Sequence, residues 1–242
     1  MEETYNTIGI VTKNEPWREY DSKVKIYTLD RGLLEMVARG TKKIKSKLAG
    51  HLEPATLVNL MVVRGRQWPY VGFATNENSY INLKEDLASL TIVGKIFKAV
   101  NGLIKAEESD ERIFYLLANA LTVINDKKSL RKDFDLIYST FLFKLLALLG
   151  YGLELYYCVV CKSKILANNK SKINFSKGGL ICPKCQNKGS KTILTISDNC
   201  IKILRIIIKE NFKKTVNIKI NKNLTKEVVN IIDHYQQVYQ NL

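Results

Sequence analysis

Four cysteines in two closely spaced pairs constrain this chain more than any other feature. Cys158 and Cys161 are separated by two residues, and Cys182 and Cys185 repeat that spacing after twenty further residues. Each pair can place two thiolates on one ion, and both pairs together supply the four sulfur ligands of a tetrahedral zinc site. Four sulfur ligands leave no open position for water or substrate. The motif therefore predicts a structural Zn²⁺ in a small module and argues against metal-dependent hydrolysis.

Two other interpretations of the cysteine pairs are weaker. Disulfides need an oxidising compartment, whereas the N-terminal residues have neither the charged start nor the apolar run of a secretory signal peptide. A thioredoxin-like redox site uses a single Cys-x-x-Cys at the start of a helix. The fifth cysteine, Cys200, lies within an apolar helical pattern, so we expect it to be a small buried core residue.

Positive charge is concentrated in the last third of the chain. The formal net charge is +15, and residues 158–242 carry 16 Lys or Arg against 4 Asp or Glu, whereas residues 81–157 carry 10 against 10. Such a basic segment predicts a polyanionic partner, most simply nucleic acid. A general bias toward Lys, Ile and Asn is the alternative, but it would not leave the middle of the chain neutral.

The distribution of apolar residues predicts a soluble, cytoplasmic protein. No stretch approaches the roughly 20 uncharged residues that span a bilayer. Lys202 and Arg205 interrupt even the apolar run at residues 201–208.

The first eighty residues are predicted to form β-structure. Short runs rich in Val, Ile, Leu, Thr and Tyr are separated by turn residues such as Pro, Gly, Asn and Asp. The predicted strands cover residues 5–13, 23–29, 33–39, 56–64 and 70–76. Five short strands favour a small closed barrel over residues 1–80, with the OB-fold as the leading candidate. An SH3-like barrel is the alternative.

From residue 81 onward the apolar residues recur at steps of three and four, which indicates helices. Three helices are predicted in residues 81–157. Ser109–Asp110 and Ser129 are the expected N-caps of the second and third helices, and Gly150 and Gly152 end the third.

The cysteine segment interrupts this helical region. Residues 158–190 form the predicted zinc module, and the helical spacing resumes in residues 191–242. Ser197 is the expected N-cap there, a last helix is predicted over residues 225–239, and residues 215–220 are ambiguous. The predicted class is α+β: an N-terminal OB-fold barrel followed by an all-α domain that carries a four-cysteine, zinc ribbon-like insertion.

A basic run between the third and fourth predicted strands is the candidate DNA-binding loop. OB-folds hold single strands in a positive groove with aromatic side chains, without reading the base sequence. Trp17, Trp68 and Tyr70 are available as stacking platforms. The candidate DNA-binding residues are Arg39, Lys42, Lys43, Lys45, Lys47, Arg64 and Arg66. A solvated loop without a binding role is the alternative.

The sequence lacks the motifs of several common enzyme classes. It has no G-x-x-x-x-G-K-[ST] loop and no G-x-S-x-G elbow. Its two histidines, His51 and His234, are far apart, and its carboxylates do not form the acidic pairs of a two-metal nuclease. We expect a protein that is not an enzyme and assign no catalytic residue.

Several blocks of the sequence, taken in order, are similar to one known family. They are Tyr5-x-x-x-Gly9-Ile-Val11, Ala38-Arg39-Gly40 with the Lys-rich run and Leu52-x-Pro54, Phe143-x-Leu-Leu-x-Leu-Leu-Gly150-Tyr151, Cys158-Val-x-Cys161, and Phe175-Ser-x-Gly-Gly-Leu-x-Cys182-x-x-Cys185. The chain resembles the RecO family of bacterial recombination mediators over nearly its whole length, and the last block is the most specific. Lys162 stands where a glycine often follows the first pair in this family, and Gln186 follows the second pair.

The resemblance implies a non-enzymatic DNA-repair protein of the cytoplasm and nucleoid. Such proteins bind single- and double-stranded DNA and anneal complementary strands. They bind the acidic C-terminal tail of single-strand-binding protein. They also act together with RecR to help load RecA. Because some relatives lack the cysteines, the resemblance also implies that zinc stabilises the protein and takes no part in the mechanism.

Two functions of other classes remain open. The chain could be a zinc-ribbon adaptor whose basic surfaces recognise acidic protein tails, or an RNA-binding protein, since its charge suits both. Annealing of bare complementary oligonucleotides distinguishes the adaptor from the mediator. Affinities for RNA and DNA at one salt concentration distinguish the RNA-binding protein.

Overall fold

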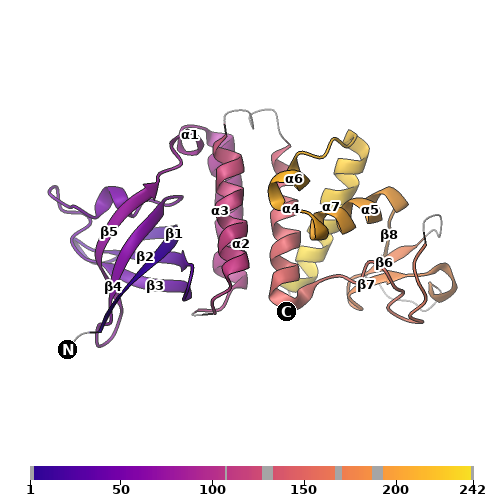
Figure 1. The fold of residues 1–242 in the computed structure, drawn as a ribbon, viewed down its shortest axis with the longest axis horizontal. Coiled ribbons are helices and arrows are strands. Elements are labelled where there is room, and N and C mark those ends of the chain that lie inside the picture. The colour runs from indigo at the N-terminus through magenta and orange to yellow at the C-terminus, as the bar shows by residue number, and fades with distance from the viewer. Residues whose placement is uncertain (1–2, 107, 127–132, 167–170, 187–192, 241–242) are drawn as a thin grey trace. The chain divides into compact units, whose positions relative to one another are not determined.

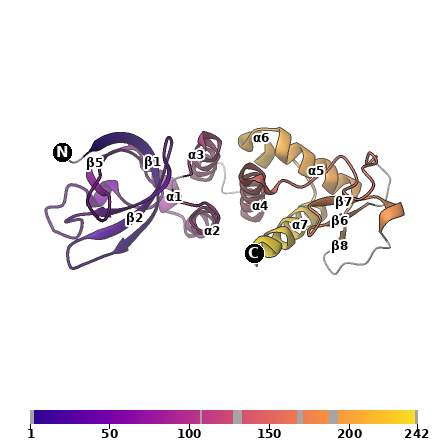
Figure 2. The ribbon, with the colours of Figure 1, turned by 90° about the horizontal axis from the view of Figure 1, so that it is seen from below.

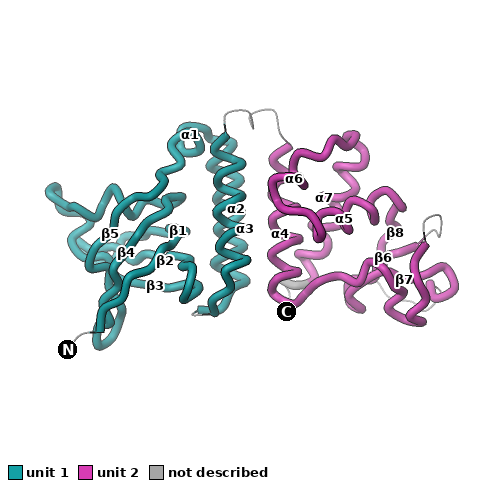
Figure 3. The backbone as a smooth tube through the Cα atoms, in the orientation of Figure 1, with its two compact units in different colours: residues 1–131 teal, residues 132–242 magenta. Residues whose placement is uncertain are grey.

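The computed structural model describes residues 3–106, 108–126, 133–166, 171–186 and 193–240. The chain divides into two compact units, Met1–Arg131 and Lys132–Leu242, coloured teal and magenta in Figure 3. This division falls inside the segment 81–157, and the finer division into four segments stays a prediction.

The first unit contains a closed five-stranded barrel (Figure 1). Its strands are β1 (Thr4–Pro16), β2 (Ser22–Thr28), β3 (Gly32–Ala38), β4 (Leu57–Val63) and β5 (Tyr70–Asn78). The order around the barrel is β1-β2-β3-β5-β4, with β1 pairing antiparallel to both β2 and β4 and a parallel contact between β3 and β5. All five predicted strands are present, and the predicted OB-fold is confirmed.

Alternating apolar side chains from the strands fill the barrel. Val24 and Ile26 of β2 face Leu34 and Met36 of β3 in a core that is almost completely buried. The long strand β1 pairs with both β2 and β4, and its register against β2 shifts between Val11 and Lys13, a bulge that bends the strand around the barrel.

Helices complete the first unit. They are α1 (Ile81–Lys84), α2 (Leu87–Leu103) and α3 (Glu111–Asn125). Asp110 caps α3 by accepting a hydrogen bond from the backbone N–H of Arg112, which confirms the cap expected at Ser109–Asp110. The Tyr27 hydroxyl of β2 donates to the Asp110 carbonyl oxygen (3.2 Å), so the start of α3 is held against the barrel.

In its described residues, the second unit combines four α-helices with a small sheet (Figure 2). The helices are α4 (Phe134–Leu146), α5 (Asp198–Lys209), α6 (Phe212–Val216) and α7 (Lys222–Gln240), and the strands are β6 (Lys172–Asn174), β7 (Gly179–Ile181) and β8 (Ile193–Thr195). The sheet order is β7-β6-β8, and α4 contacts α5, α6 and α7.

The ends of these helices test the cap predictions. Ser197 caps α5 as expected, by accepting from the backbone N–H of Cys200. The cap of α4 is Asp133, so the prediction of Ser129 is wrong for the described helix, and Ser129 itself lies outside the described residues. After α4 the chain leaves the helix at Gly150, whose positive φ of 88° favours glycine.

One helical stretch, Phe134–Tyr151, is long and apolar enough by length and composition to cross a membrane. This finding differs from the expectation that no stretch approaches that composition. Leu142 and Leu145 of α4 are fully buried, and α4 packs on α5, α6 and α7. The apolar character of the stretch is therefore that of a core helix.

Candidate metal centre and nucleic-acid interface

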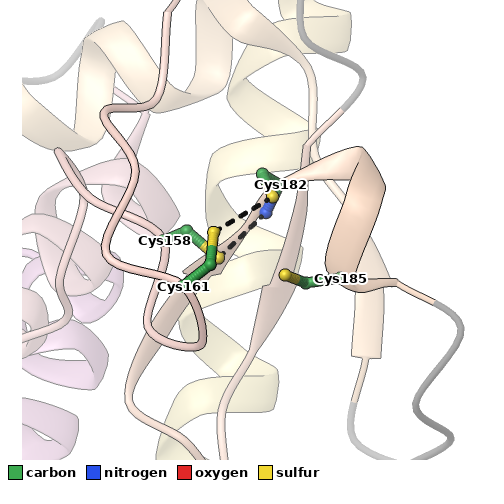
Figure 4. Close-up of side chains that lie close together, drawn as sticks. All are labelled: Cys158, Cys161, Cys182 and Cys185. Atoms are coloured by element: carbon green, nitrogen blue, oxygen red, sulfur yellow. Dashed lines mark hydrogen bonds between the residues drawn. The ribbon is translucent and has the colours of Figure 1, made fainter.

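The four cysteines predicted to bind zinc lie together in the second unit (Figure 4). Their sulfur atoms are all within 4.8 Å of one another, and Cys161 Sγ is 3.6 Å from Cys182 Sγ. Four sulfurs at about 2.3 Å from a central zinc would be roughly 3.8 Å apart in a tetrahedron. The cluster therefore fits one tetrahedral metal ion, with Cys158 buried and Cys161 exposed.

Strand β7 brings the two pairs together. The backbone N–H of Leu180 donates to the Glu154 carbonyl oxygen (2.9 Å), and the N–H of Val159 donates to the Leu180 carbonyl oxygen (2.9 Å). This pairing places Cys158 beside Cys182, whose N–H donates to Cys158 Sγ (3.4 Å). The chains approach so closely that a Cβ on Gly179 would lie 2.5 Å from the Glu154 carbonyl oxygen.

Tight turns present the sulfurs within each pair. In the first pair the N–H of Lys162 donates to the Cys158 carbonyl oxygen (2.9 Å), and the N–H of Cys158 donates to the Ser163 carbonyl oxygen (2.8 Å). In the second pair Pro183–Cys185 forms one turn of 3-10 helix, with the N–H of Cys185 donating to the Cys182 carbonyl oxygen (3.0 Å).

The thiols differ in how readily they ionise. Hydrogen bonds from the Ser163 hydroxyl and backbone N–H lower the pKa of Cys161 to about 6. Burial, followed by hydrogen bonding among the neighbouring thiols, raises the pKa of Cys185 to about 12. Because metals bind thiolates, loading of the site must release protons.

Aromatic packing joins the cysteine module to the helices of its unit. The ring of Phe175, next to β6, stacks on Tyr235 of α7 with centroids 6.0 Å apart, and Tyr235 meets Phe143 of α4 edge-on at 5.9 Å. The guanidinium of Arg205 on α5 donates through Nε to the Leu155 carbonyl oxygen (2.9 Å) and lies 4.6 Å from the centroid of the Tyr156 ring.

The second candidate site is an open groove of about 510 Å³ on the barrel. The loop between β1 and β2, the end of β3 and the loop between β4 and β5 all contribute to it. Its basic and aromatic lining residues are Trp17, Arg18, Arg39, Arg66, Trp68 and Tyr70. In OB-folds these loops and the neighbouring strands form the usual oligonucleotide surface.

Cations lie over several of the groove's rings. The guanidinium of Arg39 is 4.2 Å from the centroid of the Tyr70 ring. The Lys23 ammonium lies 4.4 Å from the ring centroid of Trp68 and 5.1 Å from that of Trp17. The groove therefore presents positive charge and flat aromatic surface together, as backbone tracking and base stacking require.

The groove brings together only part of the predicted DNA-binding set. Arg39 and Arg66 line it. Lys42 Nζ donates to the Arg18 carbonyl oxygen (3.5 Å), and the Lys43 ammonium lies 5.6 Å from the Tyr20 ring centroid, which ties the basic loop to the β1–β2 turn.

Three predicted residues lie elsewhere. Lys45 and Lys47 are exposed further along the basic loop. Arg64 pairs with Glu3 (2.7 Å) and lines a neighbouring pocket with Arg31.

Sequence reasoning missed Arg18 and Lys23. Arg18 was detectable, because it follows Trp17 directly in the turn after Pro16. Lys23 was not, since its contact with Trp68 joins β2 to a loop more than forty residues away.

Comparisons with known proteins match both units of the chain to one protein family. Residues 1–77 match the family model described as Recombination protein O N terminal, and residues 84–240 match Recombination protein O C terminal. The chain is 27% identical to DNA repair protein RecO of Thermoanaerobacter sp. (strain X514) and 27% identical to that of Desulforamulus reducens, covering 96% and 97% of this chain and 90% and 89% of those relatives. It is 28% identical to DNA repair protein RecO of Dehalococcoides mccartyi (strain 195), over 93% of this chain and 86% of that relative.

Proposed function

This chain belongs to the RecO family of DNA repair proteins, and from that premise we propose that it binds single- and double-stranded DNA through the barrel. The proposed contact residues are the groove's Arg39 and Arg66 and the neighbouring basic loop. Lys42, Lys43, Lys45, Lys47 and Arg64 extend the positive surface. The observation that carries this proposal is the convergence of guanidinium groups and aromatic rings in one open groove.

Strand annealing follows from the same charge. Two complementary strands repel each other, and a surface that screens their phosphates lets them approach. The proposed role is therefore that of a recombination mediator that brings strands together without making or breaking a covalent bond. Its proposed partners are RecR and the acidic C-terminal tail of single-strand-binding protein. Through them it would help to load RecA. The proposed location is the cytoplasm, at the nucleoid.

The four-cysteine site has a supporting role in this proposal. Cys158, Cys161, Cys182 and Cys185 offer a closed set of sulfur ligands in a spacing that suits Zn²⁺. We assign zinc a structural role, because no position remains for substrate and the site holds together the turns of the module.

Salt dependence tests the groove directly. Each neutralised phosphate adds about 0.7 to 0.9 to the slope of log affinity against log salt concentration. Replacing Arg39 and Arg66 together by Ala should reduce this slope by about 1.4 to 1.8. Replacing Lys42, Lys43, Lys45 and Lys47 together should also reduce it.

The matched control removes the same charge elsewhere in the same unit. Lys98 and Lys105 are exposed on α2 and just after it. The variant K98A/K105A should retain the slope and affinity of the wild type. Equal slopes for R39A/R66A and this control would overturn the assignment of the groove.

An annealing assay separates the mediator from other functions. Complementary oligonucleotides should anneal faster with the wild type and slower with R39A/R66A. An adaptor for acidic tails would leave the annealing rate unchanged. Tighter binding of RNA than DNA of one sequence, at one salt concentration, would favour an RNA-binding protein instead.

A further inference from the structure

We propose that Lys23 is the positioning residue of a stacking site for unpaired bases, formed by Trp17 and Trp68, through which the groove prefers single-stranded to duplex DNA. This inference rests on the proposed function, because it requires that the groove bind DNA. Beyond DNA binding itself, it specifies that the groove recognises unpaired bases and that Lys23 orients the two tryptophan rings.

Both tryptophans of the chain lie in this groove. Trp17 comes from the loop after β1 and Trp68 from the loop between β4 and β5, and the two residues are 37% and 44% exposed. Exposing two large rings at one place forgoes the free energy that burying them would give. Such exposure is expected where the rings serve a ligand.

The Lys23 side chain connects the two rings. Its ammonium lies 5.1 Å from the Trp17 ring centroid and 4.4 Å from the Trp68 ring centroid, within the range of cation–π attraction to both. Backbone hydrogen bonds also anchor the two loops. The N–H of Trp17 donates to the Asp21 carbonyl oxygen (2.9 Å), and the N–H of Val37 donates to the Pro69 carbonyl oxygen (3.0 Å).

Glu35 on β3 fixes Lys23 in turn. Its carboxylate forms ion pairs with Lys23 and with Lys25, the latter at 3.4 Å. Burial opposes ionisation of Glu35, but the two ammonium groups hold its pKa below the ordinary value. Contacts therefore run from the rigid β2–β3 pair to both tryptophans, which orients the rings before a ligand arrives.

The chemistry of the rings favours unpaired bases. A base in a single strand has a free π-face that can lie on an indole, whereas bases inside a duplex are already stacked on both faces. Each Lys23 contact uses one face of a ring, and both tryptophans are still more than one third exposed, which leaves surface on which a base can lie. Arg18, Arg39 and Arg66 stand beside the rings for the phosphates.

The placement of the tryptophans supplies a direct readout. Because the chain has only two tryptophans, both in the groove, intrinsic tryptophan fluorescence reports on this site alone. Titration with an oligothymidine of about 12 nucleotides, a length suited to one OB-fold, should quench the emission. A duplex of the same length should bind with little quenching.

Two sets of variants test the assignment of roles. W17A/W68A should bind the oligothymidine at least about 30-fold more weakly, corresponding to the loss of two stacked bases, with duplex affinity unchanged. K23M keeps the aliphatic stem and removes the charge, and it should shift the emission of the free protein and weaken oligothymidine binding about 3-fold or more. K23R should restore both properties.

The control for Lys23 lies two residues further along the same strand. Like K23M, K25M removes one positive charge from β2 and one ion pair from Glu35. It should leave the tryptophan emission and the affinity for single-stranded DNA as in the wild type. If K23M and K25M behave alike, Lys23 is not a positioning residue.

Failure of this inference differs from failure of the proposed function. Oligothymidine binding without quenching, with W17A/W68A binding as tightly as the wild type, would overturn the stacking site while leaving DNA binding intact. If the wild type bound neither single-stranded nor duplex DNA, the proposed function itself would be overturned.

Discussion

Lys162 adopts a left-handed backbone conformation, with φ of 59°, directly after the second cysteine of the first pair. Its N–H closes the turn by donating to the Cys158 carbonyl oxygen (2.9 Å), and its left-handed φ turns the chain back so that the Ser163 carbonyl oxygen accepts from the Cys158 N–H (2.8 Å). A side chain with a Cβ costs about 1–2 kcal/mol in this region. Glycine avoids that strain and loses about 0.5–1 kcal/mol through its greater freedom in the unfolded chain.

We therefore expect K162G to be more stable than K162A by about 1 kcal/mol, the reverse of the usual order of these two residues. Both variants remove the same charge, so their difference reports the backbone alone. Lys164 is the control position, because it pairs across a bridge with Tyr157. Ala should be more stable than Gly there. Thermal unfolding of the four zinc-loaded variants measures the differences, and K162A as stable as K162G would contradict the argument.

At the scale of residues, the metal ligands were predictable and the orientation of the tryptophans was not. Binding four sulfurs to one ion restricts the spacing of Cys158 and Cys161, so the spacing itself identifies the site. Lys23 reaches Trp17 and Trp68 only through the register of β2 and the course of two loops. No local pattern records such a contact.

At the scale of elements, α5 holds the cysteine module through one side chain. Arg205 donates to the Leu155 carbonyl oxygen through Nε (2.9 Å) and Nη2 (2.5 Å) and to the Ile165 carbonyl oxygen (3.4 Å). These two carbonyls lie on either side of the turn that carries Cys158 and Cys161. Removing the guanidinium would leave them without that charged donor.

We expect R205A to lower the free energy of unfolding by about 2–3 kcal/mol, as for hydrogen bonds to a charged group, and to speed the loss of zinc to a chelator. R205K keeps the charge without the forked donors and should be intermediate. K202A removes an exposed charge from the same helix and should change stability by less than about 0.5 kcal/mol. If R205A lost zinc to the chelator no faster than K202A, Arg205 would not hold the module.

The length of an element decided whether it could be predicted. The five barrel strands and the long helices repeat their apolar pattern often enough to identify them. Strands β6, β7 and β8 have three residues each, too few for alternation to be visible. Their pairing is fixed by contacts such as the one between β7 and Glu154. The short helix α6 lies partly in the segment whose pattern was ambiguous.

At the scale of the whole molecule, the metal site and the groove belong to different units. The four cysteines lie in the unit Lys132–Leu242, whereas the groove is built from the unit Met1–Arg131. Each unit has its own buried core, in the first case the interior of the barrel and in the second the packing around α4. Damage to the metal site should therefore destabilise one unit selectively.

We expect Cys158→Ser to abolish zinc binding and lower the thermal stability of the second unit, while the barrel keeps its affinity for single-stranded DNA. Cys158 is buried, so serine both removes a ligand and buries a hydroxyl. Cys200→Ser is the matched control, because Cys200 is also buried but is not a member of the four-cysteine cluster. It should lose stability and retain zinc. Metal analysis, thermal unfolding and tryptophan quenching by oligothymidine measure the three properties separately. Loss of quenching in Cys158→Ser with a folded barrel would show that the metal site supports the groove.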